Sequence, residues 1–379
     1  MQILKSAFLS ALLLAVPLQV LAADIPPPPA LAVKSYVLLD VNSDNIIAEE
    51  GASSRIEPAS LTKVMTAYLV LKALKNGHLK SDQVLPVSTA AWQAEGSRMF
   101  IEPNRPVTVE ELLHGLIVQS GNDASIALAE GVAGSEEVFA QLMTKEAKRL
   151  GMNNTNFVNS TGLPHEAHYT TAHDLALLGA ALIQDFPDHY QRHYSVKEYT
   201  YNNITQPNRN RLLWLDPFVD GIKTGHTKSA GYCLMTSAKR GDMRLISVVL
   251  GATSENARAT ESQKLLNYGF QFHESQLVYK AGQAVNQLRI WKGIDSILAA
   301  TVAKDLYITL PKGEYSRVKA KITSRQPLIA PIKAGDEVGT IDFILDDKVI
   351  DSQKLVAAED VAIAGFFGRL WDTIRLWFA

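Results

Sequence analysis

The chain has 379 residues, which is enough for about two domains with buried cores. Hydrophobic residues make up 47% and charged residues 20%, as in a folded protein, and the net charge of -2 provides neither a basic excess for nucleic-acid binding nor an acidic block typical of a disordered tail. The single cysteine, Cys233, excludes an intramolecular disulfide, and its apolar neighbours indicate a small core residue and not a nucleophile.

The first residues have the pattern of an export signal. Lys5 is followed by an apolar run over residues 7–16, by Pro17 and by small residues that end at Ala22 and Ala23. Because this run is too short and too interrupted for a spanning helix, we expect a signal peptide over residues 1–22 that is cleaved after export. An uncleaved anchor is the alternative.

Residues 23–274 are expected to form one α+β domain. A proline-rich lead-in precedes a hairpin, the middle of the segment has helical apolar spacing, and strands and a helix close it. Because strands lie at both ends of the segment, we expect them to meet in one antiparallel sheet. The expected strands are 35–39, 46–49, 231–237 and 243–250, and the expected helices are 60–74, 108–118, 123–131, 135–150, 171–184 and 255–269.

The pattern changes over residues 275–359. Apolar residues recur there at about every second position, and short turns that contain Gly, Pro or Asp separate the runs. This alternation predicts a small all-β domain. The recurring apolar residues are Val302, Leu306, Ile308, Leu310, Val318, Ala320 and Ile322, and the expected turns are 311–313, 333–335 and 346–347.

The C-terminal segment, residues 360–379, is expected to form an amphipathic helix. At 100° per residue its apolar and aromatic side chains gather on one side, and Arg369, Asp372 and Arg375 gather on the other. A charged face excludes a spanning helix, whereas an aromatic face suits a helix that lies in the membrane interface. The segment is therefore predicted to anchor the chain to a membrane surface, and a helix docked on its own domain is the alternative.

Three short motifs indicate the chemistry of this chain. They are, in chain order, Ser60-Leu61-Thr62-Lys63, Ser120-Gly121-Asn122 and Lys223-Thr224-Gly225. Each motif alone is weak evidence for an active site, because similar strings occur by chance at positions 43–45, 254–256 and 316–319. What is specific is the ordered set, placed at a helix start, in a loop between helices and at a strand start.

Ser60 and Lys63 lie three residues apart at the start of a predicted helix, so their side chains share one face. A serine hydroxyl is a weak nucleophile until a base removes its proton, and a lysine serves as that base when burial and a second cation favour its neutral form. Lys223 is a candidate for the second cation. A backbone N–H in the first helical turn can also face a developing oxyanion. Without the other motifs, an exposed helix start would be the better interpretation.

Ser120 and Asn122 lie between two predicted helices. The Ser120 hydroxyl is a candidate relay for a proton to a leaving amine, and the Asn122 amide can both donate and accept, which suits contact with Lys63 and a substrate amide. The alternative is an N-cap for the helix that follows.

The Lys223-Thr224-Gly225 motif begins a predicted strand whose edge can pair with an extended peptide. Gly225 lets a ligand approach the backbone, and Lys223 and Thr224 offer a charge and a hydroxyl to a terminal carboxylate. The backbone N–H of His226 is a candidate second oxyanion donor.

The three motifs in this order resemble the signature of penicillin-binding proteins and serine β-lactamases. The longer strings 58–63, 119–124 and 220–227 are similar to those of the low-molecular-mass penicillin-binding proteins of type 5/6, which are serine D-alanyl-D-alanine carboxypeptidases. The resemblance runs from about residue 33 to the C-terminus. It implies a penicillin-binding-protein-like α+β catalytic domain, a β-rich second domain and a C-terminal amphipathic helix on the membrane.

The resemblance also implies an activity and partners. Members of the family remove the terminal D-alanine from peptidoglycan pentapeptides through an acyl-enzyme, here expected on Ser60, and β-lactam antibiotics inhibit them covalently. Arg209, within Asn208-Arg209-Asn210, is expected near the substrate carboxylate, and no cofactor is expected. With the export signal, the resemblance implies a cell-wall enzyme held peripherally on the periplasmic side of the bacterial inner membrane.

A cluster of three histidines, His165, His168 and His173, invites a metal interpretation. Their spacing is not His-Glu-x-x-His, and serine chemistry needs no metal, so we expect loop histidines and no metal site.

Three other functions compete with carboxypeptidase activity. A β-lactamase would need fast deacylation by a Glu with an Asn four residues later, and no such pair follows Ser120. A non-catalytic penicillin sensor tends to carry spanning helices, which this sequence does not predict. A transpeptidase or D,D-endopeptidase uses the same chemistry, so the motifs leave that alternative open.

Overall fold

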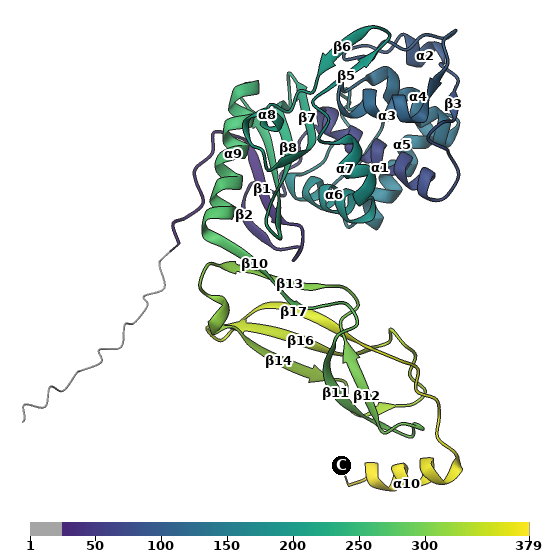
Figure 1. Cartoon of the computed structure of the whole chain (residues 1–379), viewed down its shortest axis with the longest axis vertical. Coiled ribbons are helices and arrows are strands. Elements are labelled where there is room, and N and C mark those ends of the chain that lie inside the picture. Colours follow the sequence, from purple (N-terminus) through teal and green to yellow (C-terminus); the bar gives the residue numbers. More distant parts are fainter. Residues whose placement is uncertain (1–24, 379) are drawn as a thin grey trace, which may run out of the picture.

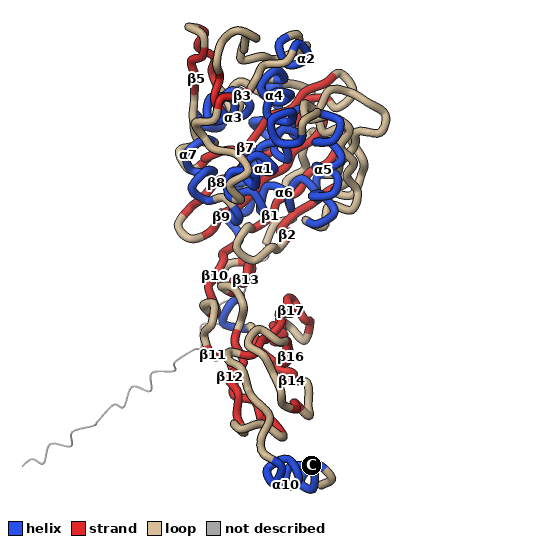
Figure 2. The backbone as a smooth tube through the Cα atoms, turned by 90° about the vertical axis from the view of Figure 1, so that its right-hand side faces the viewer, coloured by secondary structure: helices blue, strands red, loops and turns tan. Residues whose placement is uncertain are grey.

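The computed structural model describes residues 25–378, in two domains stacked along the long axis of the molecule (Figures 1 and 2). The N-terminal, α+β domain contains the three motifs, and the smaller, β-rich domain lies below it in both views. A helix, α10, lies at the far end of the β-rich domain. The predicted signal peptide lies outside the described residues.

A five-stranded antiparallel sheet with the order β2-β1-β9-β8-β7 is the centre of the first domain. The first strand pairs with the last, with Ser35 opposite Leu250, so the predicted meeting of the two ends of the segment is confirmed. All six residues of β1 are buried, because helices cover both faces of the sheet. The strands are β1 (Ser35–Asp40), β2 (Ile46–Glu50), β7 (Val219–Thr227), β8 (Gly231–Arg240) and β9 (Met243–Ala252).

Helices cover the sheet unequally. On one face the long helix α9 packs along the strands, where Leu265 and Leu266 join a buried cluster with Leu38 and Leu245, and the short α8 contributes to the same cluster. On the other face α1 and α6 lie at the centre of a larger helical layer. The helices of this domain are α1 (Thr62–Lys75), α2 (Thr89–Trp92), α3 (Val109–Ile117), α4 (Asn122–Ala133), α5 (Glu136–Arg149), α6 (Ala172–Asp185), α7 (Pro187–His193), α8 (Leu212–Leu215) and α9 (Glu255–Phe272).

Helix starts are set locally by side-chain caps. Thr108 forms a reciprocal capping box with Glu111 before α3, and the side chains of Ser135, Thr171 and Ser254 accept a backbone N–H at the starts of α5, α6 and α9. These caps fix the first turns of helices whose positions the apolar spacing predicted within a few residues. The sequence did not predict the short α2, α7 and α8, the two-stranded pair β3 (Val84–Leu85) and β4 (Val107–Thr108), or the hairpin β5 (Glu198–Tyr201) and β6 (Ile204–Pro207).

The second domain is all-β, as predicted. A six-stranded sheet with the order β14-β16-β17-β12-β11-β15 surrounds a separate buried cluster that includes Leu298, Ile341 and Leu355. Turns occur where they were expected, and Asp346 and Asp347 adopt positive φ between β16 and β17. The strands are β11 (Ala284–Trp291), β12 (Ile297–Thr301), β14 (Lys319–Ser324), β15 (Leu328–Ile329), β16 (Glu337–Leu345) and β17 (Lys348–Ala357).

A two-stranded ribbon, β10 (His273–Tyr279) with β13 (Leu306–Pro311), links the domains (Figure 2). At the junction, Thr309 Oγ1 lies 2.6 Å from Ser43 Oγ and donates a hydrogen bond of 2.8 Å to the buried Asp40. The Ser-x-Asn string at positions 43–45, which resembles the second motif by chance, therefore lies at the contact between the two domains. The other chance serine, Ser316, lies on a 3-10 turn (Tyr315–Arg317) of the β-rich domain.

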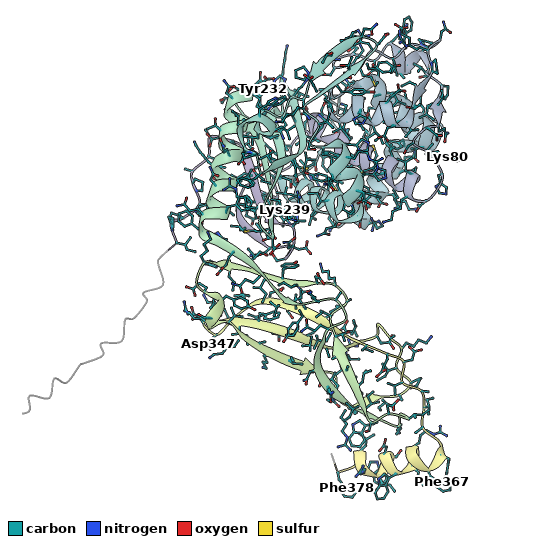
Figure 3. All side chains as sticks on the ribbon, viewed as in Figure 1. Lys80, Tyr232, Lys239, Asp347, Phe367 and Phe378 are labelled. Atoms are coloured by element: carbon teal, nitrogen blue, oxygen red, sulfur yellow. The ribbon has the colours of Figure 1, made fainter. Side chains whose placement is uncertain are left out.

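The C-terminal helix α10 (Phe366–Leu376) turns its apolar side away from the rest of the chain. None of its described side chains is buried, and the backbone N–H of Lys292 donates to Asp372 on its charged side at 2.6 Å. Phe367 and Phe378 are 83% and 86% exposed at the outer end of the molecule (Figure 3). Over the part of the chain that the structure describes, no helix combines the length and apolarity needed to cross a bilayer.

Candidate active site

Ser60 lies on a 3-10 turn (Ala59–Leu61) that leads directly into α1. Two glycines allow this turn to pack tightly. A Cβ on Gly162 would come within 1.8 Å of the Ala59 carbonyl oxygen, and a Cβ on Gly225 would come within 3.2 Å of the Ala59 Cβ. Gly225 therefore admits the serine turn itself, which is a role that the sequence did not suggest. Strand β7 and the loop at Gly162 together fix the position of Ser60.

We expect Gly162→Ala to destabilise the protein more than Gly134→Ala. Both glycines have positive φ, +84° and +79°, so either substitution introduces a comparable backbone strain of about 1–3 kcal/mol. Only the Cβ at position 162 would also clash with the serine turn, because nothing lies within 4 Å at position 134. Urea unfolding should show an additional loss of about 1–3 kcal/mol for Gly162→Ala.

The same pair of variants tests whether Gly162 positions Ser60. The rate of acylation by a fluorescent penicillin should fall in Gly162→Ala and remain unchanged in Gly134→Ala. Equal stabilities and equal rates for the two variants would show that the turn does not depend on the glycine.

Lys63 is buried one turn along from Ser60, and its Nζ has three polar neighbours. It lies 3.1 Å from Ser60 Oγ, 2.7 Å from Asn122 Oδ1 and 2.6 Å from the Thr161 carbonyl oxygen. The Thr161 carbonyl can only accept, and the Asn122 oxygen does the same, so both hydrogens of a neutral amine are used on them. The lone pair of that amine is then left for the Ser60 hydroxyl. This geometry can remove a proton from the serine.

The surroundings of Lys63 favour its neutral form. Burial, with a smaller contribution from the positive charge of Arg209, lowers the pKa of Lys63 to about 7, although the negative charges of Asp123 and Glu136 act in the opposite direction. A pKa near neutrality suits a group that must accept a proton at physiological pH.

Ser120 and Lys223 form a second buried pair beside the first. Lys223 Nζ lies 2.9 Å from Ser120 Oγ and 3.0 Å from the Thr224 carbonyl oxygen. Burial lowers the pKa of Lys223 well below its usual value, and the positive charges of Lys63, Arg209 and Arg258 add to the effect. In the free protein these surroundings favour the neutral form of Lys223, and a carboxylate ligand would favour its charged form. Ser120 adopts positive φ, which directs it into this pair.

Asn122 is the first residue of α4, and Gly121, not Ser120, is the N-cap. The Asn122 side chain faces Lys63 and donates to the Glu95 carbonyl oxygen at 2.5 Å. The next residue, Asp123, accepts backbone N–H groups from Met99 and Phe100 at 3.0 and 2.7 Å. Asp123 thus holds the loop at Met99 and Phe100 against this end of α4. Sequence reasoning did not single it out, although an acidic residue in a first helical turn was a usable signal.

The third motif lies on β7, an edge strand of the sheet, so one side of its backbone is unpaired by the sheet. Thr224 and Gly225 are buried, whereas His226 and Arg209 are exposed, and the His226 ring lies 4.1 Å from that of Tyr232. The structure thus brings all predicted site residues to one region around β7, the serine turn and the start of α4. The predictions made for their individual roles remain predictions.

Arg258 on α9 is a further buried residue behind this strand. Its guanidinium donates to the Gly225 carbonyl oxygen at 3.3 Å and to the Arg209 carbonyl oxygen at 3.5 Å. It therefore connects the two segments that carry Gly225 and Arg209. No motif marked it, because its role depends on α9 packing across the sheet.

The histidine segment has structural contacts. His168 is buried, its Nε2 lies 2.8 Å from Thr62 Oγ1, and its Nδ1 accepts the Val158 N–H at 3.2 Å. His165 accepts the Ala167 N–H within its own loop. Cys233 is buried, as predicted, and burial raises its pKa to about 11.

Comparisons with known proteins agree with the geometry. A peptidase family described as D-alanyl-D-alanine carboxypeptidase matches residues 22–254, and the C-terminal domain of penicillin-binding protein 5 matches residues 273–362. The chain belongs to the D-alanyl-D-alanine carboxypeptidase family. It is a serine-type carboxypeptidase and a hydrolase, so the resemblance, the fold class and the activity predicted from the sequence are confirmed.

The sequences of named relatives match nearly the whole chain. D-alanyl-D-alanine carboxypeptidases DacC and DacA of Escherichia coli strain K12 are 45% and 41% identical to it, over 92% and 93% of this chain and 89% and 90% of theirs. The structure of penicillin binding protein 5 from Haemophilus influenzae is similar with a TM-score of 0.84 at 40% identity, over 89% of this chain and 99% of that chain. The similarity thus includes the β-rich domain of this carboxypeptidase.

Proposed function

We propose that this carboxypeptidase removes the terminal D-alanine from peptidoglycan pentapeptides through an ester on Ser60, with Lys63 as the base. The observation that carries this assignment is the arrangement around Lys63 Nζ, where two carbonyl oxygens take the amine hydrogens and Ser60 Oγ faces the lone pair. In acylation, Lys63 takes the hydroxyl proton as Ser60 Oγ bonds to the penultimate D-alanine carbonyl carbon.

The peptide C–N bond then breaks, and the amine of the terminal D-alanine leaves with a proton. Ser120 is the proposed relay for that proton, because its hydroxyl accepts a hydrogen bond from Lys223 Nζ and can pass a proton between that amine and the leaving group. Lys223, Thr224 and Arg209 are proposed to receive the terminal carboxylate. The N–H groups of Ser60 and His226 are proposed to stabilise the oxyanion. Water finally hydrolyses the ester, which releases the shortened peptide and regenerates the Ser60 hydroxyl.

Hydrolysis of a β-lactam ester should be slow. The two carboxylates that act on Lys63, those of Asp123 and Glu136, are both engaged. Asp123 accepts backbone N–H groups, and Glu136 Oε1 accepts from the Ser160 N–H at 2.9 Å and the Ser160 hydroxyl at 2.6 Å. Among the described residues no carboxylate hydrogen-bonds to Ser60 or Lys63, so neither of these two is placed beside the ester to activate water. Penicillin-binding protein D2 from Listeria monocytogenes, 32% identical, has been crystallised in a cefotaxime-bound form, which supports a long-lived complex here.

Mass spectrometry of products from a muropeptide mixture tests the substrate assignment. We expect each pentapeptide stem to lose one alanine and cross-linked dimers to stay intact. Conversion of dimers to monomers without loss of terminal alanine would instead identify a D,D-endopeptidase. Acylation by penicillin without turnover of either peptide would identify a sensor.

We also propose that α10 holds the enzyme on the outer, periplasmic face of a bacterial inner membrane. Support comes from the exposure of its aromatic side chains and from its place at the end of the molecule remote from the α+β domain (Figures 1 and 3). Burial of this apolar surface in the lipid interface would supply several kcal/mol. Arg369 and Arg375 would add attraction to anionic headgroups.

Deletion of residues 362–379 should release the enzyme from membranes while its rate on a small soluble peptide stays unchanged, because no site residue lies on α10. A milder test replaces Phe367 and Trp377, which are 83% and 81% exposed, by serine. Val349→Ser, at a 59% exposed apolar residue of β17, is the matched control and should remain membrane-bound. A truncated enzyme that still sediments with membranes, or that loses peptide hydrolysis, would contradict the proposal.

A further inference from the structure

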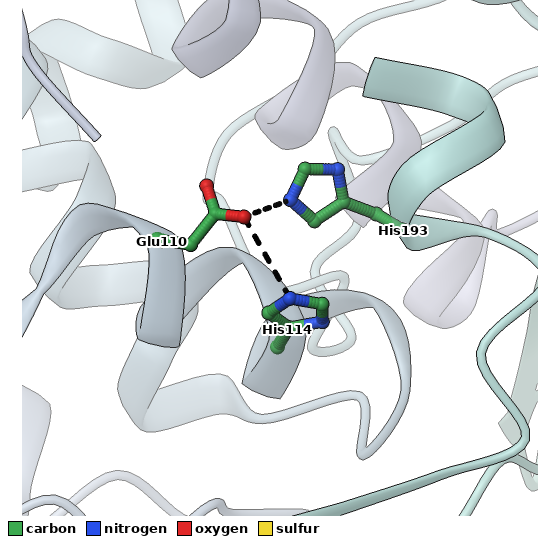
Figure 4. Close-up of side chains that lie close together, drawn as sticks. All are labelled: Glu110, His114 and His193. Carbon is green, nitrogen blue, oxygen red and sulfur yellow. Dashed lines mark hydrogen bonds and ion pairs between the residues drawn. The ribbon is translucent and has the colours of Figure 1, made fainter. Parts of the chain in front are cut away.

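A compact cluster of atoms that could bind a metal lies where α3 meets α7 (Figure 4). It includes none of the predicted active-site residues. Glu110 and His114 are four residues apart, so both lie on one face of α3, and His193 is the last residue of α7. Glu110 Oε1 is 3.0 Å from His193 Nε2 and 3.7 Å from His114 Nε2. The three ligand atoms all lie within 4.8 Å of one another.

The hydrogen bonding of His193 leaves a lone pair directed at Glu110. His193 Nδ1 is 2.8 Å from the His189 carbonyl oxygen, which can only accept, so Nδ1 carries the proton. In the neutral ring Nε2 is then an acceptor, and it faces the Glu110 carboxylate oxygen, which is another acceptor. Two such atoms at 3.0 Å need a positive charge between them, either a proton or a metal ion. A carbonyl that orients the second nitrogen is also the usual support of a metal-binding histidine.

We propose that Glu110 Oε1, His114 Nε2 and His193 Nε2 bind a divalent transition-metal ion, with Zn²⁺ as the best fit. Two imidazoles and one carboxylate form a ligand set that suits zinc, and ligands about 2.0–2.1 Å from a tetrahedral ion lie about 3.3 Å apart. The observed 3.0 and 3.7 Å lie on either side of that value, and the two imidazole nitrogens lie within 4.8 Å of one another, so side-chain rotations can bring all three atoms onto one ion. A water molecule would take the fourth position.

The site is both accessible and supported. His193 is buried, whereas Glu110 and His114 are 28% and 21% exposed, so an ion can enter from the surface. The His114 ring stacks on Tyr199 at 5.0 Å, and the Tyr199 carbonyl oxygen accepts from Gln119, the residue before Ser120. A bound ion would therefore fasten α7 to α3, the helix that leads to the Ser120 loop. Its role is structural, since none of its ligands contacts the reacting serine pairs.

Isothermal titration of the chelator-treated, full-length enzyme with Zn²⁺ tests the proposal, and Co²⁺ absorption in the visible range reports the coordination geometry. We expect one equivalent of Zn²⁺ to bind and to raise the thermal midpoint. Glu110→Gln and His114→Gln should each weaken binding by more than about 10-fold. His78→Gln, at an exposed histidine elsewhere on the catalytic domain, should change nothing.

The outcomes separate a metal site from a metal-free ion pair. Saturable binding by the unaltered enzyme and by His78→Gln, lost in Glu110→Gln, supports the site. Absence of saturable binding, or an affinity in both Glu110→Gln and His114→Gln that equals that of the unaltered enzyme, would overturn it, and the close contact would then be a metal-free ion pair of His193 with Glu110. Because Glu110 is partly exposed and its replacement is isosteric, that variant keeps the test valid if His114→Gln folds poorly.

Discussion

Replacement of Ser60 by alanine should abolish covalent labelling by a fluorescent penicillin and reduce hydrolysis of D-alanyl-D-alanine peptides by about 10⁴-fold or more. The reason is that no other described hydroxyl occupies its position, 3.1 Å from Lys63 Nζ with the amine lone pair directed at it. Gel fluorescence after incubation with the penicillin, followed by mass spectrometry of the labelled peptide, measures the effect.

Ser316→Ala is the matched control for this variant. Ser316 has the same Ser-x-x-Lys spacing to Lys319, but it lies on a turn of the β-rich domain, so labelling should be unchanged. The label should also persist for long on the unaltered enzyme, since no described carboxylate hydrogen-bonds to Ser60 or Lys63. Label that remains on Ser60→Ala would show that another residue is acylated.

Replacement of Lys63 by arginine should reduce acylation by about 10²–10⁴-fold, which is the usual contribution of a general base. Arginine keeps a positive charge but stays protonated at all accessible pH values, so it cannot take the Ser60 proton. Lys223→Arg preserves the charge that a substrate carboxylate would meet, and it should lose less activity. Rates of acylation by penicillin at neutral pH compare the two variants, and a reversed order of effects would exchange the proposed roles.

The pH dependence of acylation gives an independent check. Burial lowers the pKa of Lys63 to about 7, and the neutral amine is the active form. The rate should therefore rise with pH through about 7 and level off above it, in the unaltered enzyme. If the rate fell as pH rose through this range, Lys63 would be acting as an acid. Lys63→Arg should lose this rise.

Much of the fold could be predicted from the sequence, because the apolar periodicity that distinguishes helices from strands is a local property of the chain. Apolar spacing predicted α3 and α9 within a few residues, and alternation predicted the all-β domain. The elements that were missed are short. The hairpin β5–β6 has four residues in each strand and turns through Asn202 and Asn203 at positive φ, which gives too few residues for a periodic pattern.

The spacing of Ser60 and Lys63, one helical turn apart, and the order of the three motifs were enough to predict the nucleophile, its neighbour and the family. The protonation and the position of these groups depend on residues that are distant in the sequence. The pKa of Lys63 depends on burial and on Arg209, and the position of Ser60 depends on Gly162, which meets Ala59 across the fold. Likewise, His193 reaches Glu110 from 83 residues away. Local periodicity specifies which face of a helix is buried, but the offset between packed helices depends on how all the side chains of the core fit together.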